Sequence, residues 1–255
     1  MKNFEPKGIL SPSQTGRIRE KGALKVAREI VGHIRDERIP AGQKYLSEAE
    51  AIERHQVARG TLREALRYLQ IQGVLEIRPG PNGGHFVAQP RWESLASTIA
   101  LLLQFSEASI ESIIEARGAI DPGMASLAAA NATPEEVEEL DRLLSLLKAS
   151  LGDYDTYYEL YMDFWDQLSL MTRNPLFMFL SPALRRITWT AGIRPNEVQR
   201  EQALGGLRSI RNAVYARDEA RAFKAMKLLE ASYISTTRSE YPREIAKTIS
   251  WSDFR

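Results

Sequence analysis

The chain has 255 residues, enough for one large domain or two of ordinary size, and 44% of them are hydrophobic, which is enough for real cores. It contains no cysteine, so disulfides and thiolate metal sites are excluded. No apolar run reaches the ~18 residues that a membrane span needs, and the N-terminal segment lacks the apolar stretch of a secretory signal. We therefore expect a soluble protein of the cytoplasm with no membrane partner.

The net charge of +1 conceals an uneven distribution of charge along the chain. Residues 1–90 contain 15 Lys or Arg and 10 Asp or Glu, whereas residues 91–255 contain 19 and 23. A basic front and an acidic rear indicate that only the front half meets a polyanion. An imbalance of this size also arises by chance, so the assignment of a polyanion-binding function depends on the sequence motifs.

The front of the chain begins with an irregular segment, which two short helices follow. Residues 1–20 mix Pro, Ser, Gly and charge without periodicity, and we expect a mobile tail there. Apolar residues at helical spacing predict a first helix over about 22–38. Ser47 and Glu50 match a capping box, which begins a second helix that ends in a turn at residues 55–57.

The third helix carries a ladder of arginines. It is predicted to begin near Arg59 and to end before Gly73, a glycine that suits the position after a helix end. Its buried stripe consists of Leu62, Ala65, Leu66 and Leu69. Arg59, Arg63 and Arg67 are four residues apart, so their guanidinium groups share one face.

A β-hairpin is predicted directly after the third helix. Residues 74–78 alternate like a strand, residues 79–84 form a turn-rich tip, and residues 85–87 return. The order of helix, short turn, basic helix and hairpin is typical of a winged helix-turn-helix domain, which we place at residues 21–90.

The start of the third helix is the predicted contact with DNA. In helix-turn-helix docking the start of the recognition helix, which is the third helix of this chain, meets base edges. Arginine can bind guanine there through two hydrogen bonds. The residues placed there are Arg59, Gly60, Thr61 and Arg63. His85 and the hairpin tip are expected to reach the minor groove or a flanking phosphate. Taken alone, this segment is more simply interpreted as an amphipathic helix with a solvated basic face. The assembled order of elements favours DNA binding instead.

Residues 24–88 closely resemble the winged-helix domain of the GntR family of bacterial transcription factors. The matching residues are Tyr45, Leu46, Ser47, Glu48, Val57, Ala58, Arg59, Leu62, Arg63, Glu64, Ala65, Leu66, Leu69 and Gly73. Arg59 and Arg63 would then be the central contacts. The complete set of predicted DNA-binding residues is Ser47, Glu48, Arg59, Gly60, Thr61, Arg63, Arg67, Gly83, Gly84 and His85. Ala49 replaces a DNA-contacting arginine of the family, and Ala58 replaces a helix cap, which costs about 1 kcal/mol.

From Trp92 onward the sequence shows helical patterns and no convincing strand, so the fold class is mainly α, with an all-helical domain over 91–250. The predicted helices are 93–106, 109–130, 134–150, 154–172, 175–191, 197–216 and 218–239. Thr133 and Asp218 are expected to cap two of them. Pro122 falls within the second and should kink or split it, because proline removes a hydrogen bond of the helix.

This rear half resembles the ligand-sensing FCD domain of the FadR-type branch of the GntR family. The resembling stretches are 114–117, 127–129, 164–176 and 213–218. Many members of that branch hold a divalent metal with one Asp and three His. Those positions fall on Tyr161, Trp165, Leu207 and Leu229, and no His or Cys follows residue 90. We therefore predict no metal and no cofactor.

The four residues at the metal positions are predicted to line an aromatic and aliphatic pocket instead. Such a pocket suits an apolar or partly apolar effector, and a fatty-acyl compound is one option, because relatives that bind acyl-CoA also lack the metal ligands. Arg117 is the predicted partner of a carboxylate or phosphate on that effector. The alternative is that Tyr161, Trp165, Leu207 and Leu229 only fill the core of the bundle.

The family resemblance implies a homodimer that binds a pseudo-palindromic operator in double-stranded DNA and responds to a small-molecule effector. We expect a repressor. The alternative is a regulator whose rear domain serves only dimerisation or partner docking and senses no ligand. An enzyme is not expected, because the sequence lacks a phosphate-binding loop, a nucleophile elbow and a zinc-protease motif.

Overall fold

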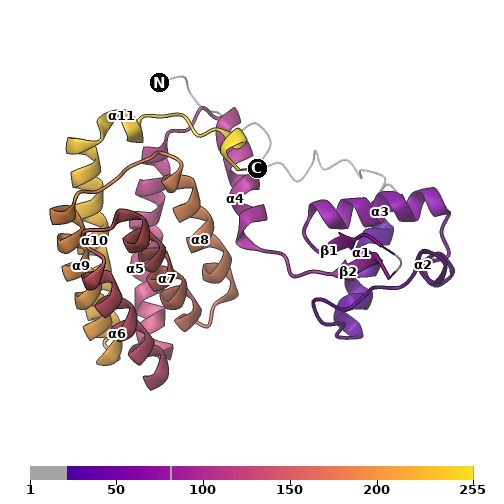
Figure 1. Ribbon diagram of the computed structural model, residues 1–255, viewed down its shortest axis with the longest axis horizontal. Helices are drawn as coiled ribbons and strands as arrows, with labels where there is room; N and C mark the ends of the chain where they lie inside the picture. Colours follow the sequence, from indigo (N-terminus) through magenta and orange to yellow (C-terminus); the bar gives the residue numbers. More distant parts are fainter. Residues whose placement is uncertain (1–21, 81, 255) are drawn as a thin grey trace, which may run out of the picture. The chain divides into compact units, whose positions relative to one another are not determined.

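The computed structural model describes residues 22–80 and 82–254, so the tail predicted for residues 1–20 lies outside the described residues. The chain divides into two compact units, Met1–Ser94 and Leu95–Arg255. The fold is mainly helical, as predicted, with one small sheet in the first unit (Figure 1). Within the described residues, no helix is long and apolar enough to cross a membrane.

The first unit is a winged helix-turn-helix. Its elements are α1 (Gly22–Asp36), α2 (Glu48–His55), α3 (Arg59–Ile71), β1 (Leu75–Arg78) and β2 (Gly84–Val87). Helices α1 and α3 pack against each other, and both contribute to one hydrophobic core. The predicted stripe of α3 is buried in that core as Leu62, Ala65, Leu66 and Leu69.

The turn between α2 and α3 is fixed by caps at its two sides. The predicted capping box is confirmed: the Ser47 hydroxyl accepts from the Glu50 backbone N–H, and the Glu50 carboxylate accepts from the Ser47 backbone N–H. Gln56 ends α2 in the left-handed conformation, with φ at 50°. Ala58 precedes α3 and supplies no side-chain hydrogen bond, as expected for alanine at a cap.

The wing is a two-stranded antiparallel hairpin. Leu75 pairs with Val87 at its base, and Arg78 pairs with Gly84 near its tip. Gly73 adopts φ of +71° directly after α3, which turns the chain into β1 at no cost in sterics because glycine has no side chain. Lys44 forms an isolated bridge with Phe86, so a third segment lies beside β2.

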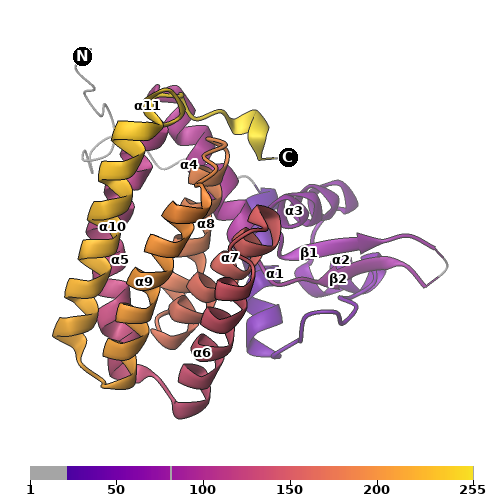
Figure 2. The ribbon, with the colours of Figure 1, turned by 60° about the vertical axis from the view of Figure 1, so that its left-hand side comes forward.

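The second unit is a helical bundle. Its elements are α4 (Trp92–Phe105, which begins in the first unit), α5 (Ile110–Asn131), α6 (Pro134–Ala149), α7 (Tyr154–Met171), α8 (Pro175–Trp189), α9 (Glu197–Tyr215), α10 (Glu219–Glu240), the short α11 (Pro242–Ile245) and a 3₁₀ turn (Trp251–Asp253). Helix α5 contacts α7, α8, α9 and α10, and it runs alongside α10 in both views (Figures 1 and 2). The caps predicted at Thr133 and Asp218 are confirmed.

Helix α5 corrects one prediction. Pro122 does not split the helix, which runs from Ile110 to Asn131 without interruption. The proline removes one backbone hydrogen bond, but tertiary packing outweighs that loss because α10 lies close along α5. The approach is so close that a Cβ on Gly118 would lie 3.0 Å from Ile234 Cδ1 of α10.

A C-terminal strap, residues 246–254, was not predicted. Its backbone pairs with the turn between α4 and α5: Ile110 N–H donates to Lys247 O, and Ile249 N–H donates to Ala108 O. The indole N–H of Trp251 then donates to Ser97 Oγ of α4 at 2.8 Å. The strap therefore ties the end of the chain to α4.

Candidate nucleic-acid interface and ligand cavity

Two arginines occupy the start of α3, where the sequence places the DNA contact. Both side chains are 72% exposed. Glu48 Oε1 of α2 lies 3.7 Å from Arg59 Nε and 3.3 Å from Arg63 Nε. Exposed ion pairs of this kind contribute little stability, so a phosphate or a base edge can replace the carboxylate at small cost. The structure thus brings three predicted residues, Glu48, Arg59 and Arg63, together.

The other predicted residues of α2 and α3 differ in their exposure to solvent and in their contacts within the protein. Gly60 is exposed, and a Cβ added there would meet nothing within 4 Å. Arg67 is exposed farther along α3. Thr61 is half-buried, and its methyl group lies near the start of α1, where a Cβ added to Gly22 would come within 3.5 Å of it. The Ser47 hydroxyl accepts the capping-box hydrogen bond from the Glu50 backbone N–H, and this contact stabilises the start of α2.

The wing tip depends on two glycines. A Cβ on Gly83 would lie 2.2 Å from Arg78 O, so no other residue fits there without moving the hairpin. Gly84 has φ of +136°, which L side chains rarely adopt. Lys44 Nζ donates to Asn82 O at 3.5 Å and adds an exposed cation at the tip, a residue that the sequence reasoning did not select.

His85 is the only histidine among the predicted DNA contacts, and it is half-buried. Burial lowers the pKa of its imidazole, and the carboxylate of Glu48 only partly opposes that shift. The ring is therefore mainly neutral at pH 7, and its use toward DNA would be hydrogen bonding and not ionic attraction.

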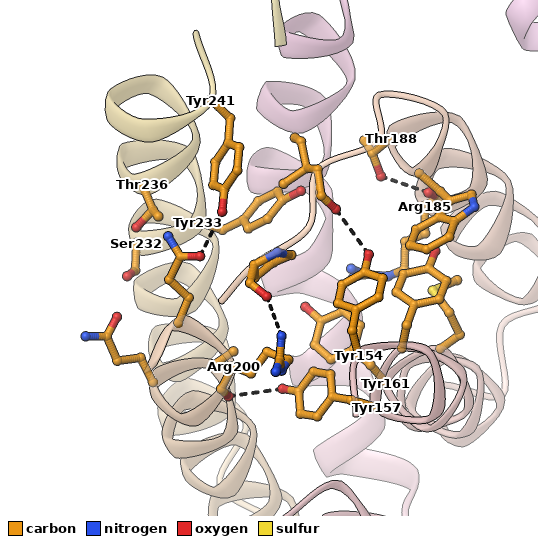
Figure 3. Close-up of a pocket in the computed structure, with 18 of the residues that line it drawn as sticks. Tyr154, Tyr157, Tyr161, Arg185, Thr188, Arg200, Ser232, Tyr233, Thr236 and Tyr241 are labelled. Carbon is orange, nitrogen blue, oxygen red and sulfur yellow. Dashed lines mark hydrogen bonds between the residues drawn. The ribbon is translucent and has the colours of Figure 1, made fainter. Parts of the chain in front are cut away.

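The second unit contains a cavity of about 140 Å³ (Figure 3). Aromatic rings form much of its wall: Tyr154, Tyr157, Tyr158, Tyr161, Trp189, Tyr233 and Tyr241. Four of these tyrosines lie on α7 at spacings of three and four residues, which places them on one face of the helix. The rings of Tyr158 and Trp189 stack with centroids 3.6 Å apart.

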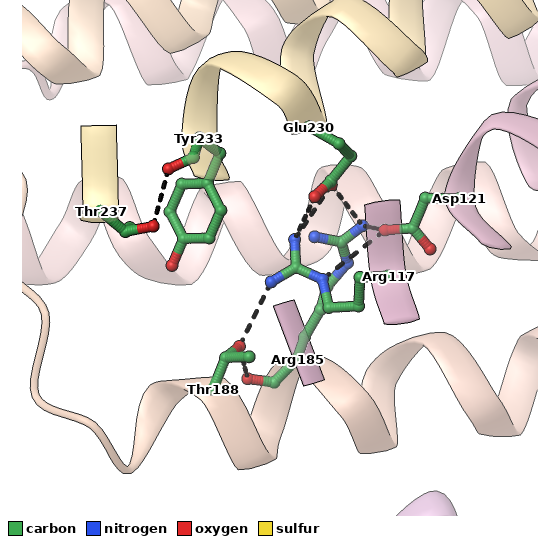
Figure 4. A network of polar contacts seen from close by, with 7 residues as sticks. All are labelled: Arg117, Asp121, Arg185, Thr188, Glu230, Tyr233 and Thr237. Carbon is green, nitrogen blue, oxygen red and sulfur yellow. Dashed lines mark hydrogen bonds and ion pairs between the residues drawn. The ribbon is translucent and has the colours of Figure 1, made fainter. Parts of the chain in front are cut away.

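A network of four buried charges lies at one side of this cavity (Figure 4). Arg117 Nη2 lies 3.0 Å from Glu230 Oε1, and Arg117 Nε lies 3.6 Å from Asp121 Oδ2. Arg185 contacts the same two carboxylates. Burial opposes the charge of Arg117, but Glu230 and Asp121 outweigh it and raise the pKa of the guanidinium. The network contains two positive and two negative groups.

Arg117 also has buried partners within the protein, which the sequence analysis did not predict. It lines the cavity, but only 4% of the residue is exposed and its guanidinium is occupied by two carboxylates and by Thr188 Oγ1. A guanidinium buried in a bundle needs charged partners, because an unpaired buried charge is very costly. The sequence could not show that Glu230, 113 positions away, supplies one of them.

The four residues predicted to form the pocket do not all line it. Tyr161 faces the cavity, and its ring contacts that of Trp165 with centroids 5.6 Å apart. Trp165 and Leu207 are fully buried in the hydrophobic core and are not among the lining residues. Leu229 packs against the core and lies next to Gly206 of α9. For those three positions, the geometry agrees with the alternative of core packing.

Arg200 is the third arginine of the cavity wall, and backbone carbonyls hold it. Its Nε donates to Leu151 O at 2.9 Å and its Nη1 donates to Pro195 O at 2.5 Å. The guanidinium carbon also lies 5.9 Å from the ring centroid of Tyr154 and 5.8 Å from that of Tyr157. The tyrosine pattern of α7 could have been read from the sequence, whereas Arg200, Trp189 and Tyr233 come from distant helices with no local signal.

The residues at the metal positions of related domains do not fit a metal ion. Trp165, Leu207 and Leu229 have no suitable donor, and the carboxylates of Asp121 and Glu230 face arginines. Across residues 22–80 and 82–254, no group of three or more His, Cys, Asp or Glu side chains could hold a metal ion.

Comparisons with known proteins agree with both units. The model of bacterial regulatory proteins of the gntR family matches residues 23–87, and the model of the FCD domain matches residues 112–230. The protein is 25% identical over 205 residues to the HTH-type transcriptional repressor NanR of Edwardsiella tarda (strain FL6-60), covering 76% of this chain and 77% of that one. It is 26% identical over 211 residues to NanR of Citrobacter rodentium (strain ICC168), covering 79% and 80%.

A solved structure supports the fold. Streptococcus agalactiae GntR superimposes with a TM-score of 0.65 at 21% identity, covering 84% of this chain and 99% of that one. The relatives are transcription regulators and not enzymes, in agreement with the motifs. The chain therefore belongs to the GntR family of bacterial regulatory proteins, and it combines the DNA-binding domain of that family with an FCD ligand-binding domain.

Proposed function

We propose that the protein is a sequence-specific repressor that binds an operator through Arg59 and Arg63. The observation that carries this proposal is the pair of exposed guanidinium groups at the start of α3, held only by loose contacts to Glu48. The repressor assignment is supported by the printed names of the relatives. Acting on DNA, the protein would work in the cytoplasm, without a cofactor.

The test begins with selection of duplexes from a random pool by the wild-type protein. Arg63→Ala should abolish specific binding to the selected duplex, since a bidentate arginine contributes about 1–3 kcal/mol of discrimination. Arg208→Ala, at an exposed position of α9, is the matched control and should bind like the wild type. Wild-type affinity of Arg63→Ala at an unchanged melting temperature would contradict the proposal.

We expect two copies to bind together. A homodimer with two winged helices reads a pseudo-palindrome, in which the spacing of the half-sites follows from the spacing of the two domains. The selected duplexes should therefore contain inverted half-sites, and light scattering should give twice the mass of the chain. Selected sites without any inverted repeat would exclude this arrangement.

The FCD cavity is the proposed effector site. An effector that binds one DNA-binding geometry better than another would change operator affinity by about 5- to 150-fold, which corresponds to about 1–3 kcal/mol of coupling. The volume of about 140 Å³ suits a compact effector, and a fatty-acyl effector would have to extend out of the cavity. If ligands leave the melting temperature unchanged, the domain serves dimerisation or docking alone.

A further inference from the structure

The cavity of the second unit has three arginines in its wall and, among the residues that the structure describes, no acidic side chain. The arginines are Arg117, Arg185 and Arg200. Asp121 and Glu230 form ion pairs with Arg117 and Arg185 but are not part of the wall, so these pairs present their cationic members to the cavity. A hollow lined by charge of one sign concentrates ions of the opposite sign, so this wall favours an anion.

Arg200 is the arginine of the wall whose charge has no ionic partner. Only 8% of the residue is exposed, and its partners are the backbone carbonyls of Leu151 and Pro195. It forms no ion pair with any carboxylate in residues 22–80 and 82–254. Burial of a charge without a counter-charge is costly, even where hydrogen bonds reduce the cost. An anion that enters the cavity would supply the missing negative charge.

Two N–H groups of Arg200 remain for such an anion. A guanidinium has five N–H groups, one on Nε and two on each terminal nitrogen. Nε and Nη2 of Arg200 donate to Leu151 O, and Nη1 donates to Pro195 O. One N–H group on each terminal nitrogen therefore has no hydrogen-bond partner among the described residues. An arginine can donate two parallel hydrogen bonds to a carboxylate, so these two donors suit its two oxygens.

Tyrosine hydroxyls of the wall add neutral donors. The hydroxyls of Tyr158 and Tyr233 make no hydrogen bond to any residue in the part of the chain that the structure describes. Burial raises the pKa of both groups, that of Tyr233 to about 12. Both hydroxyls therefore keep their protons at neutral pH and can donate them to oxygens of a ligand.

Aromatic rings form the apolar part of the wall and favour a flat ligand. Tyr158 and Trp189 stack with centroids 3.6 Å apart, and the ring of Tyr154 lies within 10° of parallel to that of Trp189. Pairs of aromatic rings contribute binding energy beyond the burial of area, which a saturated ring of the same size would lose.

The cavity opens to solvent between α9 and α10. Gln202 of α9 and Ser232 of α10 are exposed, and both belong to the wall (Figure 3). A ligand can therefore enter between these helices, and part of it can extend beyond the void. The wall selects the charge and the planar body of the ligand and does not set its length.

We propose that the cavity binds an aromatic carboxylate and that Arg200 holds the carboxylate group through its two remaining N–H groups. The ring of the ligand lies among the aromatic side chains of α7 and Trp189. Arg117, which the sequence suggested for this role, keeps Asp121 and Glu230 as partners. This inference rests on the proposed function of the cavity as the effector site, and it names the class of effector and the residue that recognises it.

Four probes separate the charge from the ring by calorimetry on the full chain. Benzoate is the probe of the proposed class, and benzamide has nearly the same shape without the charge. Cyclohexanecarboxylate keeps the charge without the aromatic ring, and acetate keeps the carboxylate alone. Benzoate should bind about tenfold more tightly than benzamide or acetate, and about two- to tenfold more tightly than cyclohexanecarboxylate. Equal or tighter binding of any of the other three overturns the proposal, and so does the absence of benzoate binding.

A substitution of Arg200 separates ligand recognition from structural support. Arg200→Lys keeps a positive charge but removes the planar pair of donors, so benzoate affinity should fall about tenfold while benzamide affinity stays the same. Arg208→Lys, at an exposed position of α9, is the matched control and should leave both affinities unchanged. Equal losses for benzoate and benzamide in Arg200→Lys would indicate a purely structural role and overturn the proposal, and so would an unchanged affinity for benzoate.

The comparison of the four probes uses the wild-type chain, so it tests the ligand class even where Arg200→Lys does not fold. Affinity for the selected duplex is measured in parallel. Duplex binding without benzoate binding overturns the ligand class alone, whereas benzoate binding without selection of any duplex overturns the DNA-binding function alone.

Discussion

Both units have arginines at their candidate sites, and the surroundings give these arginines opposite roles. In the first unit, Arg59 and Arg63 are 72% exposed and lie more than 3 Å from a single shared carboxylate. In the second unit, the side chains of Arg117 and Arg185 are 5% and 3% exposed and share two carboxylates. An arginine side chain that is surrounded by water is available to a binding partner. An arginine side chain that is enclosed by carboxylates stabilises the fold instead. Burial and pairing, and not residue type, decide the function.

The largest expected effect lies in the buried network. Arg117→Ala leaves the carboxylates of Asp121 and Glu230 with one arginine, and breaking a buried pair costs about 3–5 kcal/mol of unfolding free energy. Denaturant titration followed by tryptophan fluorescence measures it. Arg238→Ala is the control, because this exposed arginine also contacts two glutamates, Glu111 and Glu115. Equal effects of the two substitutions would remove the contrast between buried and exposed arginines.

A smaller effect is expected at the wing. Gly83→Ala places a methyl group 2.2 Å from Arg78 O, so the hairpin tip must shift, at a cost of about 1–3 kcal/mol of strain. We expect weaker binding to the selected duplex with an unchanged bundle. Gly32→Ala is the matched control, because a Cβ added to Gly32 on α1 meets nothing within 4 Å. Gly42→Ala would not serve, because Gly42 has positive φ. If Gly83→Ala bound DNA like Gly32→Ala, the wing tip would have no part in binding.

Acidification should weaken the first unit more than the second. Tyr45 Oη lies 3.0 Å from His33 Nδ1 and from His55 Nε2. Burial lowers the pKa of both imidazoles, and the positive charge of Arg54 lowers both pKa values further. Nearby carboxylates oppose the shift: Glu37 and Asp36 at His33, and Glu29 at His55. Below pH 6.5 the unfolded chain therefore binds more protons than the folded one, and stability falls until the folded-state pKa values are passed.

Hydrogen exchange between pH 7.5 and 5.5 measures this loss, after correction for the intrinsic pH dependence of exchange. Protection of the amides of α1 should decrease with acidification, and protection of the amides of α5 should change less, since no histidine lies among residues 95–254. His33→Gln should reduce the pH dependence in α1. An equal loss of protection in both units would contradict the assignment to the two histidines.

The smallest expected effect lies in the C-terminal strap. Trp251→Phe removes the hydrogen bond to Ser97 Oγ while keeping an aromatic ring, which should cost at most about 1 kcal/mol because Trp251 is half-exposed. Exchange of the amides of α4 should become faster, with little change in global stability. Unchanged exchange throughout α4 would show that the strap does not hold this helix.

Local patterns predicted the elements well. The capping box at Ser47, the caps at Thr133 and Asp218, and the glycine turn at Gly73 depend on neighbours in sequence, and all four occur. The seven helices predicted for the second half lie close to the observed ranges of α4 to α10, because each carries its own apolar period. Pro122 was predicted to kink or split its helix, and the split does not occur, since packing against α10 overrides a local preference that the sequence shows in isolation.

The ligand cavity was much harder to predict. Tyr161 was selected because of its position in a family pattern, and it does line the cavity. Trp165 and Leu207 were selected in the same way and are core residues, because a pattern of ligand positions does not show which side chain faces a void. Asp121 lies one turn along α5 from Arg117, but Thr188 on α8 and Glu230 on α10 reach Arg117 only in the assembled bundle.

Protection of a single thiol by DNA tests the central contrast most directly. The chain has no cysteine, so Gly60→Cys on α3 and Gly205→Cys on α9 each introduce one thiol at a helical site where an added Cβ meets no atom within 4 Å. The selected duplex should protect the thiol at position 60 from alkylation by N-ethylmaleimide and leave the one at position 205 reactive. Equal reactivity of position 60 with and without bound duplex would contradict the assignment of α3 as the DNA-reading helix.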